Sequence, residues 1–126
     1  MAAATRFATL ATVSGDGRPH VVPIVHAVVD DVIVFAVDHK PKSGERLRRL
    51  TNIEINPRVA VLFDERTENW DELWWVRADG VASIHAEPPP TAAALAGRHP
   101  EYGRRPPVGP WVQIHVERWS GWSASA

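Results

Sequence analysis

The chain has 126 residues, a formal net charge of −1 and no cysteine. This length suits one domain with a buried core, so we treat residues 1–126 as a single domain. The absence of cysteine excludes disulfides, thiol catalysis and cysteine-ligated metals, and the near-neutral charge argues against a nucleic-acid partner. No apolar run is as long as a membrane span and the start lacks a signal-peptide pattern, so we expect a cytoplasmic protein without a membrane partner.

The chain opens with a predicted hairpin. Residues 7–13 favour a strand, Gly15-Asp16-Gly17 favours a tight turn, and residues 21–29 form the returning strand. Pro23 lies inside the returning strand and has no backbone N–H to donate. It therefore indicates either a bulge or a strand edge at this point.

A basic segment follows the third predicted strand, residues 32–37, which is apolar on both faces as in a closed barrel. Ser43 is a credible N-cap for a helix that ends at Asn56-Pro57. The N-terminus of a helix favours anions, and basic side chains add to that attraction. We therefore predict a phosphate cradle made of Lys40, Lys42, Ser43, Arg46 and Arg49. The same spacing also suits a solvated basic helix face.

Strands dominate the rest of the chain. We expect them over residues 58–63, 73–85 and 112–116, with a bulge at Asp79-Gly80 in the long middle strand. Residues 65–72 between the first two are polar and predict a loop or a single helical turn.

The region between the last two strands predicts little regular structure. Residues 91–98 are rich in alanine and predict a short helix capped by Thr91, whereas the prolines and glycines of residues 100–110 indicate an irregular segment. Hairpins outnumber helices along the whole chain. The pattern therefore predicts a mainly β fold, a six-stranded antiparallel barrel with short helices, and not a doubly wound parallel sheet.

Six tryptophans are unusual in so short a chain. Trp74 and Trp75 are adjacent in a strand and must point to opposite faces. We expect Trp74 to enter the core and Trp75 to face a groove, a partner subunit or a ring-shaped ligand. Arg77 lies on the same side as Trp75, and a buried arginine would need a partner.

The six histidines are scattered, without the spacing of metal ligands on one element, so no metal site is predicted. His26 and His39 are the candidates for a substrate pocket, because they lie near the predicted phosphate cradle. No acid–base pair or nucleophilic triad stands out, so the catalytic residues stay unknown.

Several segments carry a family resemblance: Ala11-Thr-Val, Asp16-Gly-Arg-Pro-His-Val-Val-Pro, Val37-Asp-His-Lys-Pro-Lys, Leu47-Arg-Arg-Leu, Asn56-Pro-Arg-Val-Ala-Val-Leu, Leu73-Trp-Trp-Val-Arg-Ala-Asp-Gly and Arg118-Trp-Ser-Gly-Trp. In this order they resemble the split-barrel family of pyridoxamine 5′-phosphate oxidase-like proteins. Within that family they look most like the small actinobacterial oxidoreductases that use the deazaflavin coenzyme F420. The resemblance covers nearly the whole chain.

The resemblance implies a six-stranded split β-barrel that forms a homodimer, with two equivalent cofactor sites in grooves at the dimer interface. It implies that the cradle holds the cofactor phosphate and that the ring lies along the second and third strands. The residues expected beside the ring are Pro23, Ile24, Ala36, Val37, Trp74 and Trp75. Relatives usually carry an N-terminal helix before the first strand, and here only about five residues precede it. We therefore expect that helix to be missing or truncated.

The function implied is hydride transfer between the deazaflavin ring and a small unsaturated or conjugated substrate. FMN is the alternative cofactor, because both molecules carry a tricyclic ring and a phosphate. A second hypothesis is a dimer that binds flavin or haem without turnover. A third, nucleic-acid binding through residues 46–58, conflicts with the net charge.

Overall fold

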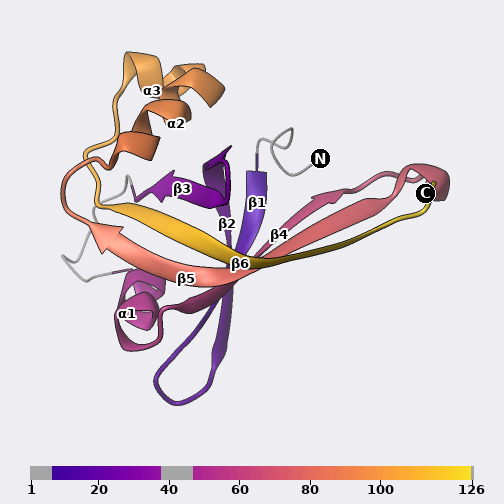
Figure 1. Ribbon diagram of the computed structural model, residues 1–126, viewed down its shortest axis with the longest axis horizontal. Helices are drawn as coiled ribbons and strands as arrows, with labels where there is room; N and C mark the ends of the chain where they lie inside the picture. Colours follow the sequence, from indigo (N-terminus) through magenta and orange to yellow (C-terminus); the bar gives the residue numbers. More distant parts are fainter. Residues whose placement is uncertain (1–6, 38–46, 126) are drawn as a thin grey trace.

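The computed structural model describes residues 7–37 and 47–125 (Figure 1). The strands in these ranges are β1 Phe7–Val13, β2 Pro19–Val29, β3 Val32–Ala36, β4 Arg58–Glu65, β5 Trp74–His85 and β6 Trp111–Ser123. The helices there are α1 Arg48–Ile55, α2 Ala93–Arg98 and α3 Pro100–Arg104, with 3₁₀ turns at Trp70–Glu72 and Pro90–Ala92.

The six strands form a closed antiparallel barrel in the order β1-β2-β3-β6-β5-β4, as the sequence predicts. Alternate residues of each strand point inward, and the inward positions are apolar. Leu10, Ile33, Val61, Phe63 and Ile114 are fully buried there. The far ends of β4, β5 and β6, where Glu65 pairs with Trp74 and Trp74 pairs with Ser123, extend away from the barrel as an arm (Figure 1).

β6 is longer than the sequence predicts. Residues 119–123, interpreted as a tail, continue the strand because they pair with β5 as far as Trp74 and Ser123. The predicted irregularity at Asp79-Gly80 is confirmed as a register shift between β5 and β6, but the extra residue is Glu117 of β6 and not a residue of β5. Gly80 is required there, because a Cβ atom would lie 2.5 Å from the His115 carbonyl oxygen.

β2 changes partner halfway along its length. Residues 19–25 pair with β1, and residues 26–29 pair with β3. Pro23 stands opposite Thr9 in the first half, which has only one sheet neighbour in the described part of the chain. The edge interpretation of Pro23 is therefore confirmed, and the β1–β2 register runs past it without a bulge.

α1 covers one end of the barrel, with Leu50 and Ile53 in the barrel core. The Asn52 side chain donates a hydrogen bond of 3.0 Å to the Thr12 hydroxyl of β1, and both residues are buried. The helix begins at Arg48, later than predicted, with Leu47 at the cap position and no side-chain cap. Ser43, the predicted cap, lies outside the described residues.

α2 and α3 lie together beside β3 at the end of the molecule opposite the arm (Figure 1). Leu95 and Tyr102 pack with Ala27, Val34 and Trp111 in a second apolar cluster. The predicted cap of α2 is wrong, because Ala92 holds the cap position and the Thr91 hydroxyl instead donates to the Gln113 side-chain oxygen at 2.7 Å.

α3 was not predicted. It forms where an irregular segment was expected, and its first residue, Pro100, suits the first turn of a helix because its missing N–H needs no partner there. In the described ranges, no helix combines the length and apolar character needed to cross a bilayer.

Candidate functional site

A small cleft opens where β2 and β3 separate. His26 and Phe35 are the last pair of the β2–β3 ladder, so the residues beyond them, Val25 and Ala36, are no longer joined. The resulting space of about 140 Å³ is the β2–β3 cleft. Its lining is Pro23, Ile24, Val25, Phe35, Ala36, Arg49 and Tyr102.

The β2–β3 cleft brings together four residues that the sequence assigns to the cofactor. Pro23 and Ile24 come from β2, Ala36 comes from the end of β3, and Arg49 comes from α1. Because this half of β2 pairs only with β1, its backbone groups on the cleft side have no strand partner in the described chain. Such groups are free to hydrogen-bond to the polar edge of a ligand.

Arg49 is the charged group of the cleft. Its side chain is half-buried, and its Nε atom is buried without a hydrogen-bond partner among the described residues. Burial lowers the pKa of the Arg49 guanidinium, because desolvation disfavours the charged form. An unpaired buried donor on a cation is costly. Because Arg49 lines the cleft, an anionic ligand there would lie beside its charge.

Several predicted site residues lie elsewhere or outside the described ranges. Lys40, Lys42, Ser43, Arg46 and His39 are outside the described residues, so their roles stay predictions. Val37 lies in the barrel core at 3% exposure, and its backbone N–H donates to the Pro110 carbonyl. His26 is buried with its ring 5.0 Å from that of Phe63. Neither residue is in the lining of the β2–β3 cleft.

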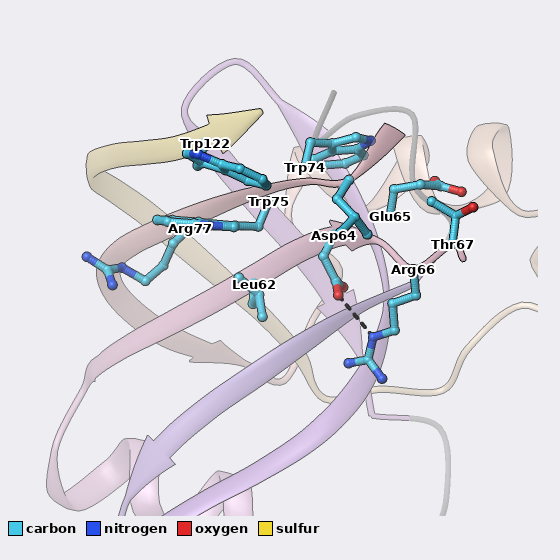
Figure 2. A pocket seen from close by; sticks show the side chains of 10 residues that line it. Leu62, Asp64, Glu65, Arg66, Thr67, Trp74, Trp75, Arg77 and Trp122 are labelled. Atoms are coloured by element: carbon cyan, nitrogen blue, oxygen red, sulfur yellow. Dashed lines mark hydrogen bonds and ion pairs between the residues drawn. The ribbon is translucent and has the colours of Figure 1, made fainter. Parts of the chain in front are cut away.

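Trp74 and Trp75 belong to a separate hollow on the arm. This aromatic groove has a volume of about 570 Å³ and is lined by Leu62, Asp64, Glu65, Arg66, Thr67, Leu73, Trp74, Trp75, Arg77 and Trp122. Figure 2 shows the Trp75 and Trp122 rings one above the other, with Arg77 next to Trp75. Trp74 also packs in part against the barrel core, as predicted, but it is half-buried like Trp75 and lines the same groove.

The cations of the aromatic groove already have partners. Arg66 Nε lies 2.9 Å from Asp64, as the dashed line in Figure 2 marks, and Arg77 Nε lies 3.1 Å from Asp79. The groove therefore offers flat apolar surface, and both arginines in its lining are paired.

A third hollow, the side cavity, adjoins the β2–β3 cleft. It has a volume of about 310 Å³, is lined by Phe7, Val25, His99, Glu101 and Tyr102, and shares Val25 and Tyr102 with the cleft. Sequence reasoning missed both residues: Tyr102 lies in the segment interpreted as irregular, and His99 was counted only among the scattered histidines. The one available signal was that Tyr102 is the single tyrosine of the chain.

The chain is similar to one known protein family and to several solved structures. A family model described as pyridoxamine 5′-phosphate oxidase matches residues 2–123. No curated protein matches the chain. A solved structure of a conserved hypothetical protein from Mycobacterium tuberculosis is similar at 26% identity and a TM-score of 0.75, with 96% of this chain and 79% of that chain covered.

Two further structures share the fold at lower identity. An FAD-binding protein from Mesorhizobium loti is 22% identical with a TM-score of 0.70, covering 94% of this chain and 86% of that one. HutZ, the heme storage protein from Vibrio cholerae, is 19% identical with a TM-score of 0.71, covering 94% and 85%. At these identities the likeness establishes the fold alone.

Proposed function

The chain belongs to the pyridoxamine 5′-phosphate oxidase family, and on that premise we propose that it is an oxidoreductase whose β2–β3 cleft binds coenzyme F420, with FMN as the alternative cofactor. The observation that carries the proposal is Arg49, whose buried Nε lacks a partner beside strand residues assigned to the cofactor ring. A phosphate-bearing ring molecule matches both features of the cleft.

The chain's own residues would bind and orient the cofactor. Arg49 would donate hydrogen bonds to an anionic oxygen, and the unpaired edge of β2 would hydrogen-bond to the ring. Ile24 and Phe35, which are buried, would exclude water from the ring. When bound, the ring supplies the hydride chemistry toward a small unsaturated or conjugated substrate. The protein contributes position, charge and a dry surface.

A second copy of the chain would complete the site. The β2–β3 cleft, at about 140 Å³, is smaller than the usual ligand pocket of roughly 300–1,000 Å³. The aromatic groove offers apolar surface to a partner, and Trp122 is 51% exposed. These observations support a homodimer with shared cofactor sites. A cytoplasmic location, and the absence of nucleic-acid and membrane partners, stay predictions.

The alternative from another class is binding of flavin or haem without turnover. The fold likeness to HutZ, described as a heme storage protein, favours keeping this alternative. Turnover separates the two classes: oxidation of the reduced, bound cofactor on addition of a conjugated acceptor supports the enzyme. Tight binding without such oxidation, over a panel of acceptors, supports the binding protein.

The proposed function is tested by titrating the purified protein separately with F420, FMN and haemin, following tryptophan fluorescence. We expect F420 or FMN to bind, and Arg49→Gln to weaken that binding by roughly tenfold or more, since it removes a charge-assisted hydrogen bond. Arg48→Gln is the matched control, because Arg48 is exposed on the same helix and outside the cleft lining. Equal binding by both variants would contradict the assignment of the cleft.

A further inference from the structure

We propose that the side cavity is the substrate site of this protein and that His99 selects the substrate. The proposal rests on the proposed function, because it takes the neighbouring β2–β3 cleft as the cofactor site. The two hollows share Val25 and Tyr102 as a common wall. A molecule in the side cavity therefore lies directly beside a ring in the cleft, as transfer between the two requires.

His99 is held in one tautomer by the fold. The residue is 2% exposed, and its Nε2 atom lies 2.6 Å from the backbone carbonyl oxygen of His26. A carbonyl oxygen only accepts hydrogen bonds, so Nε2 carries the hydrogen and donates it. In the neutral ring, Nδ1 is then an acceptor. The edge of the Tyr102 ring, with centroids 6.1 Å apart, fixes the orientation of the imidazole further.

The remaining lining defines the ligand's chemical class. Phe7 and Val25 provide apolar walls, Glu101 lines the same hollow, and an anion would meet the lone pair of the His99 Nδ1 acceptor. The Nδ1 atom of His99 accepts a hydrogen bond from a hydroxyl or N–H group. The side cavity thus takes a small, largely apolar molecule that carries a hydrogen-bond donor and no negative charge.

The side cavity also depends on α3, which supplies part of its lining. Tyr102 reaches both hollows because α2 and α3 pack against Ala27 and Val34 on the outer face of β2 and β3. The short helical segment therefore contributes lining to both hollows. We assign His99 as a specificity-determining residue and Tyr102 as the shared wall.

Three probes of one shape test this chemistry by isothermal titration calorimetry on the full chain, with and without bound FMN or F420. They are 2-naphthol, which carries a donor, 2-methoxynaphthalene, which lacks it, and the anion 2-naphthoate. We expect 2-naphthol to bind roughly five- to tenfold more tightly than 2-methoxynaphthalene, as for one hydrogen bond. We expect 2-naphthoate to bind more weakly than either, and bound cofactor not to compete with 2-naphthol.

Two variants localise the effect. Glu101→Trp fills the cavity at an exposed position and should reduce 2-naphthol affinity by about tenfold or more, while cofactor affinity changes less than about threefold. Glu87→Trp, at an exposed site outside the cavity lining, is the control. His99→Gln keeps an N–H for the His26 carbonyl but removes the Nδ1 acceptor. It should abolish the preference for 2-naphthol over 2-methoxynaphthalene, a ratio that a purely structural role would not change.

The outcomes separate this proposal from the proposed function. Competition between cofactor and 2-naphthol, or undiminished 2-naphthol binding by Glu101→Trp, overturns the side cavity as a distinct substrate site. An unchanged probe preference in His99→Gln overturns the role of His99. Loss of F420 and FMN binding together with the expected probe pattern would instead overturn the proposed function and leave a binding cavity.

Discussion

The β2–β3 cleft and the aromatic groove differ in size and in how their charges are satisfied. The groove has about 570 Å³ and the cleft about 140 Å³. Both arginines of the groove are paired with aspartates, whereas Arg49 in the cleft has a buried Nε without a partner among the described residues. The larger hollow is suited to apolar contact with another surface, and the smaller one to an anion. The two hollows thus offer different chemistry, apolar surface in the groove and an unpartnered cationic donor at the cleft, and volume alone does not distinguish them.

The largest expected effect is a difference in stability loss between alanine variants of the two adjacent tryptophans of the groove. Trp74→Ala should lower the free energy of unfolding by about 3–5 kcal/mol, because the ring packs on the barrel core. Trp75→Ala should cost within about 1 kcal/mol for the separated chain, because its ring lies on the outer face. Urea denaturation at several protein concentrations measures both and isolates any part due to association. Equal losses at low concentration would show that Trp75 is also a core residue.

A second test asks whether the groove is an association surface. Trp122→Glu should weaken self-association by about 2–4 kcal/mol, the range for a central aromatic residue of an interface. Sedimentation velocity over a dilution series measures this change. Val108→Glu is the control, because Val108 is equally apolar and 73% exposed but lies in the segment between α3 and β6. A dimer that tolerates Trp122→Glu would move the interface away from the groove.

The smallest expected effect concerns a turn that lies outside both the cleft and the groove, so it serves as a reference for the larger effects. In the β1–β2 turn, a hydrogen bond from the Ser14 hydroxyl is the largest cause that holds the pKa of the Asp16 carboxyl below its ordinary value of 3.8. A carboxyl with a depressed folded-state pKa adds stability above its unfolded-state pKa, and this stability is lost as the pH falls through the folded-state pKa.

Asp16→Asn should therefore lower the melting temperature slightly near about pH 7 and make no difference near about pH 2. Cofactor affinity should stay unchanged, because Asp16 is not in the lining of the cleft. Thermal unfolding across this pH range measures the effect. A difference between wild type and variant that grows on acidification would contradict the assigned sign.

Local sequence signals were sufficient for most of the barrel. Alternating apolar residues and short turns predict β1 to β5, and Asp30, with a φ of 52°, lies in the turn between β2 and β3. The second half of β6 was missed because residues 117–119 are all exposed and give no two-residue alternation. Only pairing with β5, distant in sequence, makes this segment a strand. Thr91 was misassigned for a similar reason, since its partner Gln113 lies on β6.

The candidate site also combines residues that the sequence pointed to with residues that depend on contacts between distant parts of the chain. Pro23, Ile24, Ala36 and Arg49 were identified from the resemblance, because they lie on elements whose order matches the family. Tyr102 and His99 depend on how α2 and α3 dock on the barrel, which is set by the contacts of Leu95 and Trp111 in the second apolar cluster. No local pattern encodes that docking.

The single extra residue of β6 determines on which face of the sheet every later side chain of that strand lies. Before the bulge, Ile114 and Val116 point toward the barrel interior. After it, Trp119 lies on that same face of the sheet, opposite Ala78 and with its ring 6.2 Å from that of Phe63, although it remains 37% exposed. Trp122 consequently stands opposite Trp75 on the outer face. Deleting Glu117 would shift this alternation by one residue, turning Trp119 outward and Trp122 inward. One exposed glutamate thus decides which tryptophan of β6 lies on the outer face with Trp75.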